Sequence, residues 1–221
     1  MPSRKNDPAP PVVDPVVLAD LAPGDRYDLT RDVDLEGFAF TGLDLDEVDL
    51  RDASVYSSRF DGLRAPQVDL RAATLAEVAL ERLDVPVLKG VRGRWRDVEV
   101  TGGRLGSAEL YESAWQSVRF VGCKLSFVNL RGADLQDVAF TDCTIDELDL
   151  VQATVRRMAF TGTRVRRLDV QASTLLDVDL RGARIDELGG IGSLRGATID
   201  QEQLGHLAPA LAQELGIVVT D

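Results

Sequence analysis

The chain has 221 residues, 44% of them hydrophobic, and a formal net charge of −12 from 37 acidic and 25 basic residues. This balance disfavours direct binding to nucleic acid or to anionic membranes and favours basic partners. The longest apolar runs are too short to span a bilayer, and Pro and Asp interrupt the N-terminal segment where a secretory signal would need a continuous apolar stretch.

The N-terminal segment is rich in proline, since six of the nine prolines lie in residues 1–23. Residues 1–14 are therefore predicted to form a disordered tail. Residues 15–32 are predicted to cap the repeats that begin at residue 33, because the open end of a repeat array exposes both its core and a strand edge.

Residues 33–187 repeat every five residues, which is neither the period of a helix nor that of a strand. A large apolar column runs from Leu35 to Ile185, and only Ala65 and Gly90 interrupt it. A second column of apolar or small residues lies two positions before it. Residues two apart in an extended chain point to the same side, whereas the next step of three requires a corner. The pattern thus predicts short edges joined by corners, wound around an inward-facing core.

A longer period, equal to four of these five-residue units (quintets), shows how many edges make one coil. The phenylalanines of the apolar column are separated by multiples of this period, and Trp95 and Trp115 are one period apart. Four quintets therefore form one four-sided coil, in which like residues stack on like. About eight coils at roughly 4.8 Å each predict a rod about 38 Å long. The predicted core ladder consists of Phe40, Phe60, Phe120, Phe140 and Phe160.

The sequence resembles the pentapeptide-repeat proteins, whose consensus is A(D/N)LXX. "GADLQ" at 132–136 and "NLRGADL" at 129–135 match it closely, and degenerate copies cover 33–187. The resemblance implies an all-β solenoid, specifically a right-handed quadrilateral parallel β-helix, but it does not imply one function. Residues 85–95 form the weakest repeat, where Pro86, Gly90 and Gly93 predict a local bulge or distortion, although the five-residue register continues and no long loop is inserted.

Residues 188–221 are predicted to hold a last repeat and a C-terminal helix. Asp200 and Gln203 read as an N-cap and capping box, Pro209 is expected to kink or restart the helix, and Gly216 to end it. One apolar stripe of this helix either caps the final coil or forms the seam of a homodimer. The stripe includes Leu204, Leu207, Leu211 and Leu215.

No catalytic, cofactor-binding or metal site is predicted. His206 is the only histidine and lacks the partners that a metal site or a nucleophilic pair requires. Cys123 and Cys143 are separated by the same four-quintet period, so they are expected to stack inward, either as core residues or as a redox pair, and core packing is favoured. Two cysteines cannot form a disulfide framework, which favours a reducing cytoplasmic location.

Surface charge is the remaining signal. The residue directly before each member of the large apolar column points outward. On one face of the coil, these outward residues form a column that is mostly acidic. The neighbouring face carries a mostly basic column, with Arg64, Arg104, Lys124, Arg164 and Arg184. We call the first column the acidic ladder, and its candidate partner-binding residues are Asp49, Asp69, Glu109, Asp149 and Asp169.

Two interpretations of the acidic ladder remain open. The side chains can bond nearby backbone at the corners of the coil, or the spaced carboxylates can imitate the phosphates of duplex DNA. Family members that protect DNA gyrase from quinolones resemble DNA in this way. The predicted function is therefore a non-catalytic protein-interaction module, most concretely a DNA mimic that binds gyrase or another basic DNA-binding protein. The alternative is a scaffold rod without mimicry, as a monomer or a homodimer.

Overall fold

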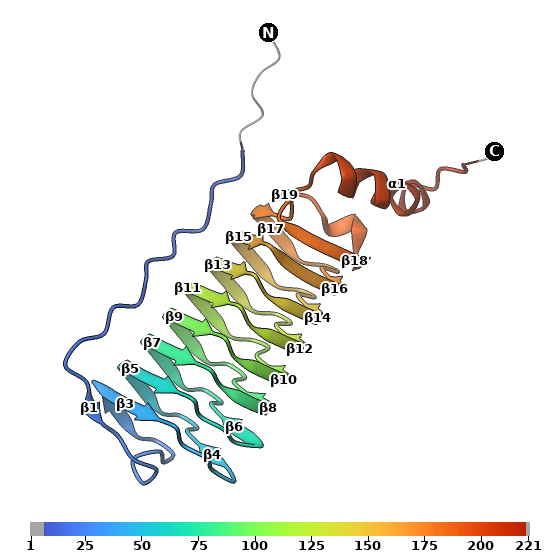
Figure 1. Ribbon diagram of the computed structural model, residues 1–221. Helices are drawn as coiled ribbons and strands as arrows, with labels where there is room; N and C mark the ends of the chain where they lie inside the picture. Colours follow the sequence, from blue (N-terminus) through green and yellow to red (C-terminus); the bar gives the residue numbers. More distant parts are fainter. Residues whose placement is uncertain (1–6, 220–221) are drawn as a thin grey trace.

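The computed structural model describes residues 7–219, which wind into a parallel β-solenoid of about nine turns with one C-terminal helix (Figure 1). The predicted fold class is confirmed. The count exceeds the predicted eight coils because strands form outside 33–187 at both ends: β1 (Ala22–Pro23) pairs with the first coil, and β19 (Ala197–Thr198) pairs with the last.

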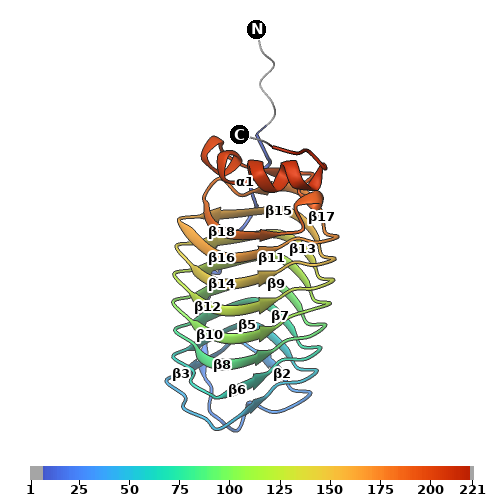
Figure 2. The same cartoon turned by 90° about the vertical axis from the view of Figure 1, so that its right-hand side faces the viewer.

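The strands form two parallel sheets on two sides of the rod (Figures 1 and 2). The first sheet follows the order β1-β3-β5-β7-β9-β11-β13-β15-β17-β19, and β2 pairs with β5. Its other strands are β2 (Asp34–Glu36), β3 (Phe38–Thr41), β5 (Ser54–Asp61), β7 (Thr74–Glu81), β9 (Arg94–Thr101), β11 (Ala114–Val121), β13 (Asp134–Thr141), β15 (Thr154–Thr161) and β17 (Thr174–Asp179).

The second sheet follows the order β18-β16-β14-β12-β10-β8-β6-β4, so each strand pairs with the strand one coil away. Its strands are β4 (Val48–Asp49), β6 (Gln67–Asp69), β8 (Asp84–Lys89), β10 (Arg104–Glu109), β12 (Lys124–Asn129), β14 (Thr144–Asp149), β16 (Thr163–Asp169) and β18 (Ala183–Gly189).

Neighbouring coils pair in a register of four quintets, so equivalent positions lie directly above one another. Phe120 pairs with Phe140, and their ring centroids are 5.1 Å apart; the next pair, Phe140 and Phe160, is separated by 5.3 Å. Trp95 and Trp115 stack at 5.0 Å. Each coil therefore buries its apolar columns against the coils on both sides, as a continuous core.

The corners explain how a step of three residues still returns the chain to the core. In the coil of β13, Gly132, Asp137 and Asp142 all have left-handed backbone, with φ of 61°, 58° and 52°. Equivalent positions in the neighbouring coils repeat this conformation along the rod. The fourth corner, at Phe127 and Glu147, has no left-handed residue in the described coils. Gly and Asp, which adopt this conformation readily, occupy many positions at these three corners, and Ser, Ala, Glu, Gln and Arg occupy the others.

The predicted distortion at residues 85–95 is wrong. β8 pairs with β10 in the same register as the other coils, and Val85 and Leu88 remain in the core. Neighbouring coils accommodate the unusual residues. A Cβ atom at Gly106 would lie 2.4 Å from the Pro86 carbonyl oxygen, so glycine there allows the two coils to approach closely.

The N-terminal segment also differs from its prediction. Residues 7–14 are not a free tail: with residues 15–21 they form an extended strap that runs lengthwise along the rod (Figure 1). We call residues 7–21 the strap. The Val12 N–H donates to Asp137 Oδ1 at 2.9 Å, and Arg181 contacts Asp7 at 3.0 Å. These polar contacts and partly buried apolar side chains offset the cost of ordering the chain. Residues 1–6 of the predicted tail lie outside the described residues.

At the other end, the 3₁₀ helix η1 (Ile191–Ser193) leads to β19 and then to α1 (Gln201–Glu214), which lies across the last coil (Figure 2). Asp200 and Gln203 form the expected capping box, and α1 continues through Pro209 as one helix. The Gln203 amide also donates to the Leu180 and Ala183 carbonyls at 2.7 and 2.8 Å. These bonds satisfy backbone groups that the end of a solenoid leaves open.

The leucine stripe of α1 is divided between two environments. Leu207 and Leu211 are half-buried, whereas Leu204 and Leu215 are 41% and 74% exposed.

None of the helices in the described part of the chain is long and apolar enough to cross a membrane.

Candidate functional site

The acidic ladder forms one column on the second sheet. Asp49 pairs with Asp69, and Asp149 pairs with Asp169, each one coil apart. Lys89, Glu109 and Asn129 fill the three coils between them. The structure therefore brings together the residues that the sequence placed on one face.

Most of these side chains bond the backbone of their own corner. Asp49, Asp69, Asp149 and Asp169 each accept the N–H of the residue two positions later, at 3.0 to 3.2 Å. Asn129 makes the same bond with its amide oxygen at 3.2 Å. This is the local turn that Asx side chains favour. Because an uncharged amide serves equally well, the geometry favours the corner interpretation of the ladder.

Arginines pair with four of the five ladder carboxylates. Arg51, Arg71 and Arg131 approach Asp49, Asp69 and Asp149 respectively, each at 2.6 Å. Arg167 lies 4.0 Å from Asp169. The Asp69 and Asp149 side chains are only 5% and 7% exposed. Among the described residues, Glu109 has neither an ion pair nor a side-chain hydrogen bond. The ladder is thus a column of paired charges rather than a row of free carboxylates.

These arginine contacts make stability depend on acid pH. Hydrogen bonds from Arg51 lower the pKa of Asp49 from 3.8 to about 2, and hydrogen bonds from Arg157 and Arg181 lower the pKa values of Asp137 and Asp179. A carboxyl with a lower pKa in the folded state stabilises it above the unfolded pKa, and this contribution is lost as the pH falls towards the folded pKa.

We therefore expect the urea midpoint to fall between about pH 4 and about pH 2. Substitution Arg51→Gln removes the partner of Asp49, so this variant should lose less stability over that interval than the unsubstituted protein. Urea titrations followed by circular dichroism at several pH values measure both slopes. Equal slopes for the two proteins would contradict the assignment.

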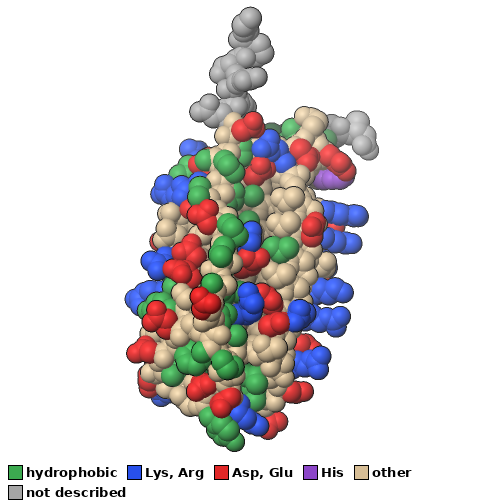
Figure 3. All heavy atoms as spheres, turned by 60° about the vertical axis from the view of Figure 1, so that its left-hand side comes forward, with side chains coloured by type: hydrophobic (Ala, Val, Ile, Leu, Met, Phe, Trp, Pro, Cys, Tyr) green, Lys and Arg blue, Asp and Glu red, His purple; other side chains and the backbone are tan. Residues whose placement is uncertain are grey.

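The basic column lies on the neighbouring face of the second sheet. Its residues are exposed, and Arg164 contacts Asp186 at 2.7 Å. Arg104 and Lys124 make no ion pair with any described residue. Figure 3 shows Lys and Arg side chains projecting in a row along one edge of the rod, with both signs of charge mixed over the face in view. The rod therefore presents fixed charges of both signs.

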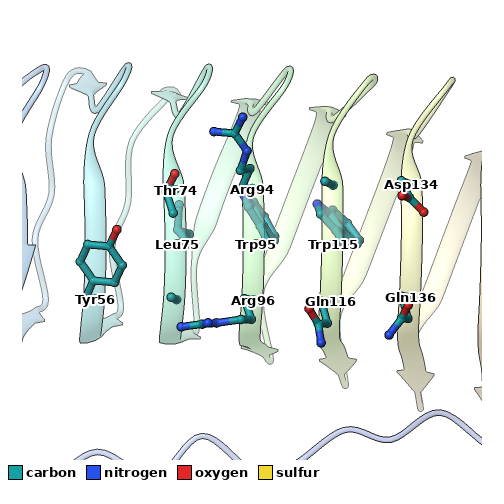
Figure 4. A pocket seen from close by; sticks show the side chains of 12 residues that line it. Tyr56, Thr74, Leu75, Arg94, Trp95, Arg96, Trp115, Gln116, Asp134 and Gln136 are labelled. Atoms are coloured by element: carbon teal, nitrogen blue, oxygen red, sulfur yellow. The ribbon is translucent and has the colours of Figure 1, made fainter.

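A shallow hollow of about 450 Å³ lies on the outer face of the first sheet (Figure 4). Tyr56, Ala76, Arg96, Gln116 and Gln136 line it in one row across five coils (Figure 4). Within residues 7–219, no three His, Cys, Asp or Glu side chains come together in a way that could hold a metal ion. The hollow offers polar and cationic contacts on an open surface.

The two cysteines lie in one inward column with Thr163. Both are buried free thiols, and Cys123 and Cys143 donate to backbone carbonyls at 3.3 Å. The hydrogen bond with Cys123, together with burial, raises the pKa of the Cys143 thiol. This environment is that of core residues, since Cys123 and Cys143 are only 1% and 2% exposed and a reactive cysteine needs exposure.

Comparison with known proteins places the repeat in a family. Residues 113–189 match the model of the pentapeptide repeat region, and no curated protein matches the chain. Among solved structures, HetL, a pentapeptide-repeat protein involved in heterocyst differentiation regulation from the cyanobacterium Nostoc sp. strain PCC 7120, is 18% identical, with a TM-score of 0.41 over 77% of this chain and 91% of HetL. QnrB1, a plasmid-mediated fluoroquinolone resistance protein, is 17% identical, with a TM-score of 0.44 over 88% of this chain and 95% of QnrB1.

The stacked coils and their five-residue period define a four-sided parallel β-solenoid. The matched segment continues in the same register through the coils that precede it. Residues 113–189 are thus similar to a pentapeptide repeat region, and the same four-sided coil extends beyond them in both directions.

Proposed function

We propose that this protein is a non-catalytic interaction module whose rod presents fixed charges to a basic protein partner. The observation that carries the proposal is a set of exposed acids on the first coils that form no ion pair with any described residue: Asp34, Glu36, Asp44 and Asp46. Four of the five ladder carboxylates, in contrast, pair with arginines. A rigid core holds the exposed acids in place, so little conformational entropy is lost when a partner binds.

We call Asp34, Glu36, Asp44 and Asp46 the acidic end, and a matched pair of variants tests its role. The first reverses Asp34, Glu36, Asp44 and Asp46 to Lys, and the second reverses Glu112, Asp134, Asp142 and Asp146, which are equally exposed but lie on later coils. Both change the net charge by the same amount. In quantitative affinity purification from a lysate, we expect basic proteins to be retained by the second variant and lost by the first. Equal retention by both variants would contradict the proposal.

The most concrete form of this proposal is a DNA mimic that binds gyrase or another basic DNA-binding protein. The net charge of −12 and the stacking of coils at about 4.8 Å support it. Purified gyrase should then supercoil DNA more slowly at micromolar protein, and the acidic-end variant should lose this effect. An unchanged supercoiling rate, with or without a quinolone, would exclude gyrase as the partner.

The acidic ladder needs a different variant, because Asp149→Lys would place a cation beside Arg131 in a buried position. Replacing Asp49, Asp149 and Asp169 by Asn keeps the corner bond, as Asn129 demonstrates. If the ladder contacts the partner, this variant should bind at least tenfold more weakly. If the rod is a scaffold and the ladder serves only its corners, partner affinity should remain unchanged in the same titration.

A further inference from the structure

The strap covers one corner of the solenoid along its length. It begins beside Arg181 of the last coils, passes Asp137, and reaches the first coil, where β1 pairs with β3. Figure 4 shows it as the pale blue trace below the strands, beside the hollow lined by Gln116 and Gln136. One extended segment therefore lies against most of the coils.

Burial identifies the covered corner. At this corner the left-handed residues Ser117 and Asp137 are only 8% and 5% exposed, whereas their equivalents at two other corners, Gly132 and Asp142, are exposed. Ala76, which points outward from β7, is only 4% exposed. We call this column the strap corner; every member except the exposed Glu77 is buried or half-buried. Its described members are Gly37, Ser57, Glu77, Asp97, Ser117, Asp137, Arg157 and Asp177.

The strap has a spacing that matches the rod. Its half-buried residues follow alternating steps of three and two, and the residues between them are exposed, including Val12 at 61% and Val17 at 82%. Five residues of extended chain cover about 15 Å at 3.1 Å per residue, and three coils cover about 14 Å. Apolar side chains therefore return to equivalent places on the corner. The half-buried residues are Pro8, Pro11, Val13, Val16, Leu18 and Leu21.

Few polar contacts hold the strap. Among the described residues, Val12 is the only strap residue whose backbone N–H bonds the rod, and four prolines have no N–H to donate. The Ser117 hydroxyl is buried at this corner without a hydrogen-bond partner among the described residues, which costs about 1–3 kcal/mol. Release of the strap would return this hydroxyl to water. The spacing of its apolar residues therefore fits the strap to the rod, but few hydrogen bonds must break before another segment can replace it.

We propose that the strap corner is a binding site for an extended, proline-containing segment of a partner protein, which displaces the resident strap. The site selects apolar residues in alternating steps of three and two, because five residues of extended chain span three coils and so return to equivalent positions on the corner. Asp137 accepts a backbone N–H of the bound segment, and Arg181 pairs with a carboxylate near its N-terminal end. This recognition is separate from the acidic end, so each surface can be tested alone.

The full chain allows a direct test with matched strap variants. One variant carries Val13→Asp and Val16→Asp, which place charges against the rod and release the strap. The control carries Ala9→Asp and Val17→Asp, which change exposed side chains only and leave the Val12 contact in place. The probe is a fluorescein-labelled peptide with the sequence of residues 7–21. Its fluorescence anisotropy reports binding to each protein.

We expect saturable binding to the released variant and at least tenfold weaker binding to the control and to the unsubstituted protein, because a tethered strap competes at roughly millimolar effective concentration. A peptide of residues 7–21 that carries Val13→Asp and Val16→Asp should not bind the released variant. Absence of binding to the released variant, or equal binding to all three proteins, would overturn the proposal. Self-association of the released variant without peptide binding would assign the corner to a second copy instead and would also overturn it.

Hydrogen exchange in the unsubstituted protein provides a test that needs no variant. The Val12 amide should exchange at least 100-fold faster than core amides such as those of Val118 and Val138, since strap release requires no unfolding of the coils. Equal exchange rates would show that the strap opens only with the whole rod, which contradicts displacement by a partner.

Discussion

Insertion of a single alanine between Val138 and Ala139 is expected to destroy the cooperative fold. Both residues lie in β13, which pairs in register with β11 and β15. One extra residue turns Phe140 and the following inward side chains outward, and it breaks the pairing on both sides of the strand. We expect a loss of about 4 kcal/mol or more, measured as the disappearance of the cooperative urea transition.

Duplication of a whole coil is the matched control. A second copy of residues 131–150 after Leu150 would place Phe140 against its own copy and leave every column in register. The rod should lengthen by about 4.8 Å in small-angle scattering, with an unfolding midpoint no lower than before. A stable one-residue insertion or an unfolded duplication would contradict the stacking that the structure displays.

Substitution Phe140→Ala is expected to reduce the free energy of unfolding by about 3–5 kcal/mol. The Phe140 ring is 1% exposed and lies between the Phe120 and Phe160 rings. Its removal leaves a cavity that the neighbouring coils cannot close, because strand pairing fixes their separation. Urea unfolding followed by circular dichroism measures the loss.

Phe127→Ala provides the same substitution on the outside of the rod. Phe127 is half-buried and points away from the core column, so its loss should cost about 1 kcal/mol or less. Similar losses for the two variants would mean that the phenylalanine ladder does not dominate the core.

The sequence predicted the coil because its signal is periodic and entirely local. A step of five implies corners, and the separation of Phe120 and Phe140 gives the number of sides. Left-handed Asp137 and Asp142 make those corners. The same logic failed at Pro86, where composition suggested a distortion but Gly106 in the next coil provides the space. Whether an unusual residue fits depends on the residue one coil away, and the composition of a single repeat does not show that pair.

The candidate surfaces were less predictable because their electrostatics depend on side-chain direction. The register placed Asp69 and Asp149 in one column, but it did not show that Arg71 and Arg131 bend back to neutralise them. The strap was missed for a similar reason. Its prolines suggested disorder, whereas the spacing of Val13 and Val16 was the available signal and matched no helix or strand period.

The strap also changes how the rod responds to force. Coils that contact only their neighbours can peel away one at a time from either end. Here Asp7 joins the N-terminal segment to Arg181 near the last coils, while β1 is fixed to the first. Tension that pulls the two ends apart loads this exposed ion pair first, so the strap should detach before any coil separates, and the coil contacts then carry the force.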